Sequence, residues 1–493
     1  MDKILRELQD NQNVRANLSD LRKLIKEENA KKQLLVEVQK QESLFFSFLH
    51  SEDAKTRKNA ALLLGDLEYQ NAIVELYDAY VQEKTLFVRA SYLEALAQLD
   101  VADKLEALKD SLTHLLNSEV TPENRKHTDE EIRALREIII LYEGITRHTA
   151  DVKGKKVSVI LMTNRSQRET VRRSITCGTA TVHPLGVLVE TDHLPELMKL
   201  RTYREMIFPL KKEGFFPSNP VACAQEIWNS NILELLDGLH KEQGSYYFRV
   251  ECKSAFELEE RSAFTKKLAA ELERLSKGEL INSTSDYEVE LRLIANKDGE
   301  FFVGVSLSTM KSNRFAYRKN AIAASIHPST AALIMEIAAP YLKEDAQIMD
   351  PFCGVGTMLI ERDERVPARE MYGTDIFGDA ILFARENTDL AKKKINYIHR
   401  DFFDFKHDYL FDEIVTNMPL RGKKSKQEMD DFYRDFFEKS KEILAKEAIL
   451  VMYTNEIGFV KKQLRLHKEY SLLQETCLQA KNDFYLLILS YKG

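Results

Sequence analysis

The sequence predicts a multidomain protein with an all-α helical N-terminal region, an α+β middle region and a C-terminal α/β domain built on a doubly wound, mostly parallel sheet. The chain of 493 residues is long enough for about three domains of roughly 150 residues each. Residues 1–145 contain almost no glycine and no alternation of apolar and polar residues that would indicate strands. From residue 331 onward, short apolar runs alternate with helical stretches, which is the pattern of a parallel sheet covered by helices.

Composition and charge limit the function classes. Hydrophobic residues make up 44% and charged residues 30% of the chain, which is ordinary for a soluble globular protein. The net charge of −7 argues against a surface that is basic throughout but leaves a local basic groove open. The five cysteines form no CxxC pair, so neither a zinc site nor a disulfide framework is predicted. No apolar signal segment and no run of ~18 apolar residues is present. We therefore expect a cytoplasmic protein with no metal site and no membrane contact.

Residues 1–150 are predicted to be stacked helices, because apolar residues recur at three and four positions. The segment also contains a weak internal repeat: residues 57–67 (RKNAALLLGDL) align with residues 89–99 (RASYLEALAQL). This repeat resembles HEAT-like helical repeats, whose period is about 40 residues. A plain helical bundle is the alternative. A domain of this kind is expected to dock a protein partner or to brace its neighbour.

The middle region begins near residue 151, where strand-like runs such as KVSVILMT appear between helical stretches. Its predicted parts are a ferredoxin-like lead-in at residues 151–215, a second α+β unit at 216–310 and a linker at 311–330. The α/β domain then covers residues 331–493. Its strand candidates include AQIMD, MYGTDI, YIHRDFFDF and DEIVTNM. Parallel sheets of this type bind ligands at the carboxyl ends of their strands.

The strongest local signal is the segment DPFCGVGT at residues 350–357, where a strand ends in an acid and enters a glycine-rich turn. Such a turn lets the backbone approach a ligand closely. A dinucleotide site would need a third glycine where this chain has Leu359, and Asp350 would repel a pyrophosphate. The amine and sulfonium of S-adenosylmethionine are cationic and suit an acid, so this cofactor is predicted. The expected cofactor-binding residues of the segment are Asp350, Phe352, Gly354, Gly356 and Thr357.

Two further acids follow the next strand candidates. Asp375 is expected to accept hydrogen bonds from the ribose hydroxyls of the cofactor, as an acid does at this position in nucleotide-binding sheets. Asp401 is expected to accept from the adenine amino group, with Phe402 as an apolar neighbour. A single aspartate is more often a cap or a solvated residue. Three acids at successive strand ends favour a binding site.

The segment TNMPLRG at residues 416–422 ends the fourth strand candidate. It resembles the Asn/Asp-Pro-Pro-aromatic motif of amino-group methyltransferases with a Rossmann-like domain. More closely, the chain resembles the THUMP-containing RNA methyltransferases that make N2-methylguanosine in tRNA or ribosomal RNA. The resemblance implies that the Asn417 side chain and the Met418 carbonyl accept hydrogen bonds from the exocyclic amine, which positions it for transfer. The expected catalytic residues are Asn417, Met418, Pro419 and Leu420.

The motif departs from the family at two positions. Met418 stands where the family has proline, and Leu420 stands where it has the aromatic residue that stacks on the flipped base. Aromatic stacking contributes about 1–3 kcal/mol per base. Another aromatic residue could take this role, and the candidates are Phe315, Tyr317, Phe402 and Phe403. The alternative function is that of a catalytically decayed methyltransferase acting as an RNA-binding or ribosome or tRNA assembly factor.

The resemblance covers roughly residues 151–493, and its most specific part upstream is INSTSDYEVELRLI at residues 281–294. It implies a THUMP-like RNA-binding domain at 216–310 that grips tRNA or ribosomal RNA mainly through shape and phosphates. Four cations could line one face of this domain: Lys253, Arg261, Lys266 and Lys267. The sequence leaves open which RNA is bound, and whether guanine N2 or adenine N6 is the target.

Two basic segments flank the predicted catalytic residues. The linker segment KSNRFAYRKN at residues 311–320 interleaves cations with aromatics, which suits a flipped or single-stranded nucleotide. The second segment directly follows the catalytic motif, although charge runs are usually only solvated loops. The expected RNA-binding residues are Arg314, Phe315, Tyr317, Arg318, Lys319, Arg421, Lys423 and Lys424.

Overall fold

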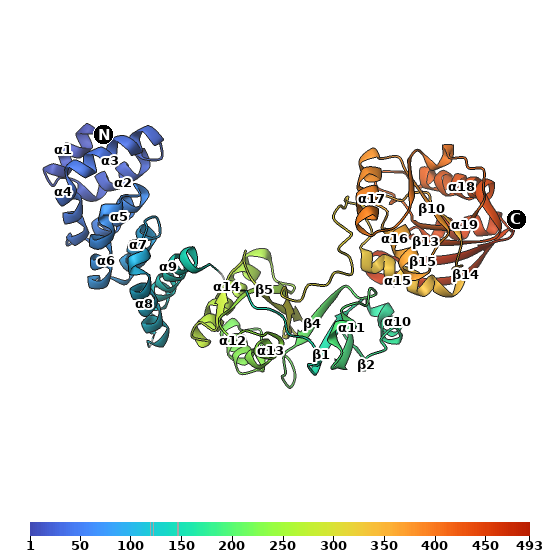
Figure 1. Ribbon diagram of the computed structural model, residues 1–493, viewed down its shortest axis with the longest axis horizontal. Coiled ribbons are helices and arrows are strands. Elements are labelled where there is room, and N and C mark those ends of the chain that lie inside the picture. Colours follow the sequence, from blue (N-terminus) through green and yellow to red (C-terminus); the bar gives the residue numbers. More distant parts are fainter. Residues whose placement is uncertain (119, 122, 145–146) are drawn as a thin grey trace.

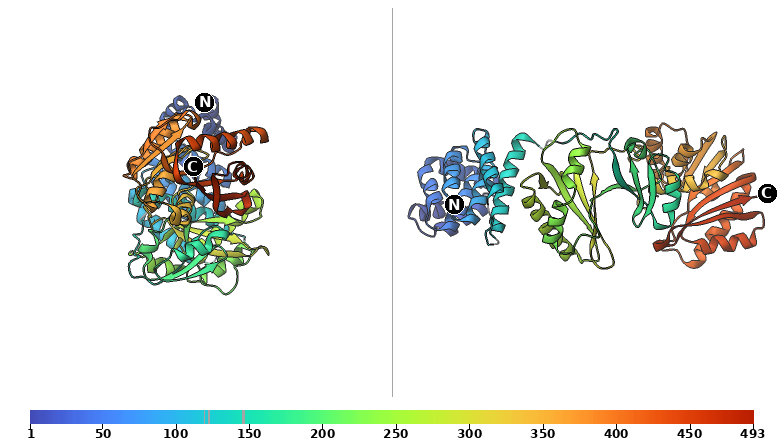
Figure 2. Two further views of the ribbon diagram at one scale, coloured as in Figure 1. Left: turned by 90° about the vertical axis from the view of Figure 1, so that its right-hand side faces the viewer. Right: turned by 90° about the horizontal axis from the view of Figure 1, so that it is seen from below.

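The computed structural model describes residues 1–118, 120–121, 123–144 and 147–493. It shows an elongated molecule with the helical domain at one end, the α/β domain at the other and the middle region between them (Figure 1). The same order along the long axis is visible from below in Figure 2. The predicted division into a helical, a mixed and an α/β part is therefore confirmed.

The N-terminal part is helical throughout its described residues. Its helices are α1 (Asp2–Gln9), α2 (Val14–Leu24), α3 (Glu28–Lys40), α4 (Glu42–Ser47), α5 (Ala54–Asp66), α6 (Ile73–Gln82), α7 (Leu86–Leu96), α8 (Leu105–Asn117) and α9 (Arg125–Glu143). Helices α2, α5, α7 and α9 pack each against the next, around a core of leucines and alanines. Gly65 lies where α5 crosses α7. A Cβ at this position would be 2.5 Å from the Cα of Ala95, so the close crossing requires glycine. The assignment to HEAT-like repeats stays a prediction.

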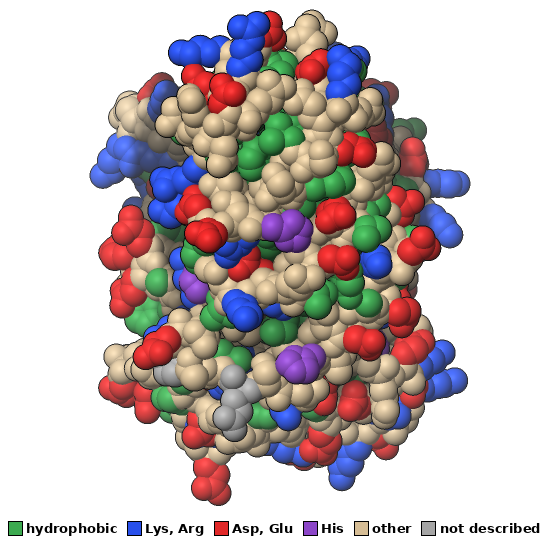
Figure 3. Space-filling model, turned by 90° about the vertical axis from the view of Figure 1, so that its left-hand side faces the viewer, with side chains coloured by type: hydrophobic (Ala, Val, Ile, Leu, Met, Phe, Trp, Pro, Cys, Tyr) green, Lys and Arg blue, Asp and Glu red, His purple; other side chains and the backbone are tan. Residues whose placement is uncertain are grey.

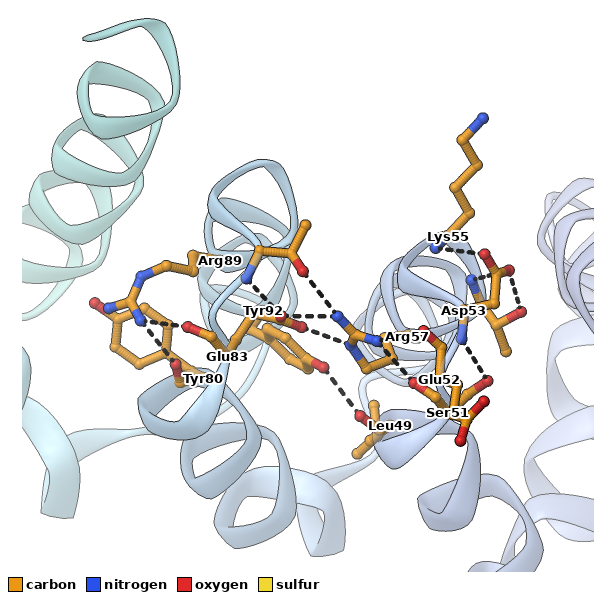
Figure 4. Close-up of polar contacts among 12 residues, drawn as sticks. Leu49, Ser51, Glu52, Asp53, Lys55, Arg57, Tyr80, Glu83, Arg89 and Tyr92 are labelled. Carbon is orange, nitrogen blue, oxygen red and sulfur yellow. Dashed lines mark hydrogen bonds and ion pairs between the residues drawn. The ribbon is translucent and has the colours of Figure 1, made fainter. Parts of the chain in front are cut away.

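The two arginines of the sequence repeat occupy equivalent places, each near the start of its helix (Figure 4). Arg57 of α5 donates from Nε and Nη2 to the carboxylate of Glu83, at 2.7 and 2.8 Å. Arg89 of α7 donates from Nε to the carboxylate of Glu131 at 2.9 Å and lies 4.7 Å from the ring centroid of Tyr80. Each arginine thus ties its helix to a segment later in the chain, so the repeat in sequence is also a repeat in structure.

In the described part of the middle region, eight strands form one sheet in the order β2-β3-β1-β4-β8-β7-β5-β6. The strands are β1 (Val157–Met162), β2 (Thr179–His183), β3 (Gly186–Thr191), β4 (Glu205–Pro209), β5 (Tyr246–Lys253), β6 (Leu280–Asn282), β7 (Val289–Ala295) and β8 (Phe301–Leu307). The helices are α10 (Arg168–Arg173), α11 (Leu194–Leu197), α12 (Pro220–Trp228), α13 (Ile232–Leu239) and α14 (Leu258–Leu275). The pairing of β4 with β8 joins the predicted units at 151–215 and 216–310 into one sheet.

The C-terminal domain is a doubly wound α/β fold, and all of its residues are described. Its sheet has the order β11-β10-β9-β12-β13-β15-β14, in which the first five strands are parallel and β15 is antiparallel to both of its neighbours, β13 and β14. The strands are β9 (Gln347–Asp350), β10 (Glu370–Asp375), β11 (Asn396–His399), β12 (Phe411–Asn417), β13 (Leu444–Thr454), β14 (Tyr470–Gln479) and β15 (Phe484–Tyr491). The helices are α15 (Pro328–Ala338), α16 (Thr357–Arg365), α17 (Gly378–Leu390), α18 (Lys426–Ile443) and α19 (Ile457–Leu466).

Helices cover both faces of this sheet. One core cluster contains side chains of α15, α16 and α17, and the other contains side chains of α18 and α19. Inside the domain, Arg362 of α16 and Glu413 of β12 form an ion pair in which both side chains are fully buried. Arg362 Nε donates to Glu413 Oε2 at 2.8 Å, and Nη2 donates to Oε1 at 2.9 Å. Burial of an ion pair is tolerated only where such hydrogen bonds replace those to water.

Polar contacts connect the three parts. Arg125 of α9 pairs with Glu271 of α14, and the buried His148 lies 2.7 Å from the carboxylate of Glu288. On the other side, the side chain of Gln167 donates to the carbonyl of Cys477 at 2.8 Å. Residues 311–327 contain no helix or strand and pass from the middle region to the C-terminal domain.

Candidate active site

The glycine-rich turn follows β9 at the carboxyl edge of the sheet, as predicted. Gly354 and Gly356 have positive φ angles of 51° and 82°. A Cβ at Gly356 would lie 2.1 Å from the Tyr397 hydroxyl oxygen, so this position requires glycine. A Cβ at Gly354 would meet nothing within 4 Å, so the backbone there borders open space. The turn is therefore shaped for a ligand that approaches the Gly354 side.

Asp350 is a buried acid with unused hydrogen-bonding capacity. Its side chain is 1% exposed, and Oδ1 accepts the Phe352 N–H at 3.1 Å. Its Oδ2 and the hydroxyl of Thr357 are buried without a hydrogen bond to any described residue. Burial raises the pKa of Asp350 to about 7, although the neighbouring Thr416 hydroxyl and the Phe352 N–H oppose this. An unpaired buried carboxyl is unfavourable by itself. A cationic group at Oδ2 would supply the missing partner.

Asp375, at the end of β10, holds the two neighbouring turns together. Its Oδ2 accepts the Gly354 N–H at 2.9 Å, and its Oδ1 accepts the Phe377 N–H at 2.9 Å. The next two side chains, Ile376 and Phe377, are 57% and 63% exposed. We did not predict these two apolar residues. The signal that could have found them is a pair of large apolar side chains directly after a strand-ending acid.

Asp401 and Phe402 follow β11 but differ in their surroundings. Asp401 is exposed and caps a short 3-10 helix, Phe402–Asp404, by accepting the Phe403 N–H at 3.0 Å. Phe402 is buried and packs against Phe352, with ring centroids 5.8 Å apart. Asp401 is therefore at the same edge of the sheet as the other acids, whereas the Phe402 ring belongs to the hydrophobic core.

The predicted catalytic segment ends β12, next to β9. The amide of Asn417 forms no side-chain hydrogen bond with any described residue, so it is available to a ligand. Met418 is buried, and its N–H donates to the Tyr453 carbonyl at 2.9 Å. Leu420 is 50% exposed. The structure thus brings Asn417 and Asp350 to the ends of adjacent strands at one edge of the sheet.

Three half-buried phenylalanines gather beside this segment. The ring centroid of Phe432 in α18 lies 5.4 Å from that of Phe352 and 5.8 Å from that of Phe403. Lys424 Nζ lies 4.9 Å from the Phe432 centroid. We did not predict Phe432, because nothing in its sequence context separates it from a core residue of an amphipathic helix. Among the residues that we proposed to stack on a base, Phe403 belongs to this group, while Phe402 and Tyr317 are buried.

The predicted RNA-binding residues of the linker need a correction. The Arg314 guanidinium donates to three carbonyls, those of Leu200, Tyr203 and Arg204, at 2.7–3.0 Å. The buried Tyr317 donates its hydroxyl to Glu361 at 2.7 Å. Arg314 therefore holds the linker to the middle region, Tyr317 holds it to the C-terminal domain, and neither side chain is available to RNA. Lys319 is exposed, and burial lowers the pKa of the half-buried Arg318.

The other residues that we predicted to bind RNA lie in the linker, in the loop after the catalytic segment and in the middle region. Phe315 lies beneath the guanidinium of Arg201, whose central carbon is 4.8 Å from the ring centroid. The loop residues after the catalytic segment that we expect to bind RNA are all exposed: Arg421, Lys423 and Lys424. In the middle region, a cleft of about 890 Å³ between β5 and α14 is lined by Lys253 and Arg261. Lys266 and Lys267 are exposed but do not line this cleft.

Known proteins resemble this chain in sequence and in structure. Residues 316–474, about a third of the chain, match the profile of a family described as RMKL-like, methyltransferase domain. An uncharacterized protein of Mycoplasma genitalium is 35% identical over 89 residues, which are 18% of this chain. The match spans about a fifth of the length of that curated relative, 20%.

Solved structures share the fold at low identity. TrmN from Thermus thermophilus superposes with a TM-score of 0.51 and 17% identity, covering 68% of this chain and 99% of that one. SMU.472, solved in complex with SAH, superposes with a TM-score of 0.50 and 16% identity, covering 69% of this chain and 99% of that one.

The C-terminal domain therefore has the class I methyltransferase fold. The unpaired oxygen of Asp350 and the open side of Gly354 fit a cationic ligand. Across the described ranges, no helix is both long and apolar enough to cross a membrane. Within the same ranges, no three His, Cys, Asp or Glu side chains are grouped so that they could hold a metal ion.

Proposed function

We propose that this protein transfers a methyl group from S-adenosylmethionine to the exocyclic N2 of a guanosine in tRNA or in 23S-type ribosomal RNA. One observation above all supports the proposal. The unengaged amide of Asn417 and the unpaired carboxyl of Asp350 lie at the ends of adjacent strands, where a target amine and a cationic methyl donor would meet.

Each acid of the site would hold a different part of the cofactor, which supplies a methyl group on a positively charged sulfur. Asp350 offers a buried oxygen to the positive charge of the donor. Asp375 would accept from the ribose hydroxyls, and Asp401 would accept from the adenine amino group. The side chains of Ile376 and Phe377 are exposed and would contact apolar parts of the cofactor.

Asn417 and the carbonyl of Met418 would hold the amine of the target base by accepting its hydrogen bonds. Positioning of this kind supplies much of the rate when the leaving group is already activated. Leu420 cannot stack as an aromatic residue does, and we assign base stacking to the neighbouring Phe403 and Phe432. The cations that would neutralise RNA phosphates near the site are the half-buried Arg318 and the exposed Lys319, Arg421, Lys423 and Lys424.

RNA is the proposed substrate because the chain carries basic surfaces outside the catalytic domain. Lys253 and Arg261, together with one acid, Glu251, line one cleft of the middle region, where residues 216–310 resemble a THUMP domain. A second candidate function is an RNA-binding assembly factor that has lost catalysis. The exposed Leu420, at the position of the family's aromatic residue, favours this alternative.

A labelling experiment separates the two candidates. The purified protein should transfer tritium from labelled S-adenosylmethionine to bulk tRNA or ribosomal RNA, and nucleoside mass spectrometry should show N2-methylguanosine. Asp375→Ala should abolish both donor binding in calorimetry and the labelling. Tight donor binding and RNA binding without any label would support the assembly factor, and label in N6-methyladenosine would move the target to adenine.

Donor binding should depend on pH through Asp350. The free carboxyl has a raised pKa of about 7, and a bound cation favours its ionised form. Below pH 7 the carboxyl must therefore lose a proton on binding, which weakens affinity, while above pH 7 it is already ionised. Because binding is linked to the loss of this proton, we expect the Kd for S-adenosylmethionine to fall about tenfold between pH 6 and pH 8. Calorimetry of donor binding to wild type and to Asp350→Asn at several pH values checks this. The variant has no carboxyl at position 350, so any pH dependence of its Kd comes from the titration of the donor itself.

A further inference from the structure

The helical domain has a groove of about 580 Å³ between α2 and α5, which is also lined by Phe87 of α7. We call it the α2–α5 groove. Its cationic lining residues are Arg15, Lys23, Lys55 and Lys58, and its one acidic lining residue is Asp20. On the end face of the same domain, basic and acidic side chains are interspersed (Figure 3). The groove is therefore a local concentration of positive charge.

Most of this charge is not compensated within the protein. Other cations of the domain pair with acids: Arg57 with Glu83 and Lys31 with Glu68. Arg15, Lys55 and Lys58 form no ion pair with any described residue, whereas Lys23 pairs with Asp20 of the same groove at 2.7 Å. Lys55 extends away from the helices (Figure 4). The nearby acid Asp53 accepts from the hydroxyl and N–H of Thr56, and these hydrogen bonds together with Arg15 lower its pKa, so its negative charge offsets part of the positive charge of the groove.

The two walls of the groove suit a chain of negative charges better than a single anion. Arg15 and Lys23 lie on one wall eight residues apart in α2, which is about 12 Å along a helix axis. Lys55 and Lys58 lie on the opposite wall. No single phosphate could reach all four cations. Between Arg15 and Lys23, the small side chains of Ala16 and Ser19 leave room for a backbone to enter.

The aromatic lining residue Phe87 favours RNA over an acidic peptide. Phe87 is half-buried, and its ring centroid lies 6.3 Å from that of His127 in α9. A base can stack on an aromatic face of this kind beside a phosphate-binding groove. An acidic peptide would use the cations alone.

We propose that the α2–α5 groove binds the phosphate backbone of RNA, so that the helical domain is a second RNA-binding surface of the protein. The proposal rests on the proposed function in one respect: the bound RNA is taken to be the methylation substrate. This role differs from the one predicted from the sequence of the helical domain, which was to dock a protein partner or to brace the neighbouring domain.

The test is the salt dependence of RNA binding by the full chain. Filter binding with bulk tRNA and with total ribosomal RNA should compare wild type, Lys55→Ser/Lys58→Ser and Arg15→Ser. Each lost phosphate contact reduces the slope of log K against log salt by about 1, so the double variant should lose about 2 and the single variant about 1. Lys26→Ser/Lys32→Ser, which removes two exposed cations outside the groove, should keep the wild-type slope.

Unchanged slopes in both groove variants, with thermal unfolding as in wild type, would overturn the proposal. So would groove variants that lose binding to polyglutamate while RNA binding stays the same. Methyl transfer is measured separately. If wild type labels RNA but the slopes do not change, the groove proposal fails alone. If no RNA is labelled but the slopes fall, the groove stands and the methyltransferase assignment to RNA fails.

Discussion

Replacing Asn417 by alanine should lower the rate of methyl transfer to RNA by about 100- to 1000-fold, the loss typical of removing one preorganised hydrogen-bonding group from an active site. The Asn417 amide ends β12 and is not used by any described residue, so its removal should leave the fold intact. Donor affinity should not change, because the acids that would bind the donor lie on other strands. Single-turnover labelling and calorimetry measure the two quantities.

Two control variants sharpen this experiment. Asn417→Asp keeps an acceptor oxygen and should retain more activity than Asn417→Ala. Leu420→Ala removes an exposed side chain of the same loop and should have a much smaller effect on the rate if Phe403 and Phe432 provide the stacking. Labelling by Asn417→Ala at the wild-type rate would exclude this residue from holding the amine.

Glu413→Leu should lower the free energy of unfolding of the C-terminal domain by about 3–5 kcal/mol. The substitution leaves the fully buried Arg362 guanidinium without its counter-ion, and the N–H of Lys343 loses the carboxylate that it donates to at 2.8 Å. Calorimetry of the full chain measures the effect on the unfolding transition that S-adenosylmethionine shifts upward, which identifies the transition as that of the C-terminal domain.

A second substitution should reverse most of this loss. Arg362→Met in the Glu413→Leu background removes the unpaired charge and fills the space with apolar atoms, which is often neutral for a buried pair. The partly exposed pair of Arg365 and Glu336 is the matched control, and Glu336→Leu should cost at most about 1 kcal/mol. An equal effect of Glu413→Leu and Glu336→Leu would show that the buried pair contributes no more than a surface pair.

The edge of the sheet that forms the site could be predicted from the sequence. Parallel strands end at one edge, so acids that follow successive apolar runs meet there, and Asp350 and Asp375 do so. The glycines between them could be predicted for the same reason, because a close turn at a strand end needs positive φ angles. The HEAT-like and THUMP-like assignments depend on family resemblance and stay predictions.

Other parts of the site depend on tertiary packing and left no local signal. Arg314 and Tyr317 belong to a basic, aromatic segment of the kind that binds nucleotides, yet the domain junction buries them. Phe432 is one apolar residue of an amphipathic helix, and only the fold places it beside Phe352. Local sequence shows which ligands a side chain could bind. It does not show whether another part of the folded chain already occupies that side chain.

The helix that begins at the glycine-rich turn also reaches the middle region. One turn into α16, the carboxylate of Glu361 accepts hydrogen bonds from Nε and Nη2 of Arg201, at 2.8 and 2.7 Å. Arg201 belongs to the unit at residues 151–215, whose sheet continues into the proposed RNA-binding unit at 216–310 through β4 and β8. A continuous path of paired strands and side chains therefore links that unit to the helix that starts at the glycine-rich turn. Under the proposed function, the position of the methylated nucleotide in the RNA is set by the distance between the RNA-binding unit and the active site.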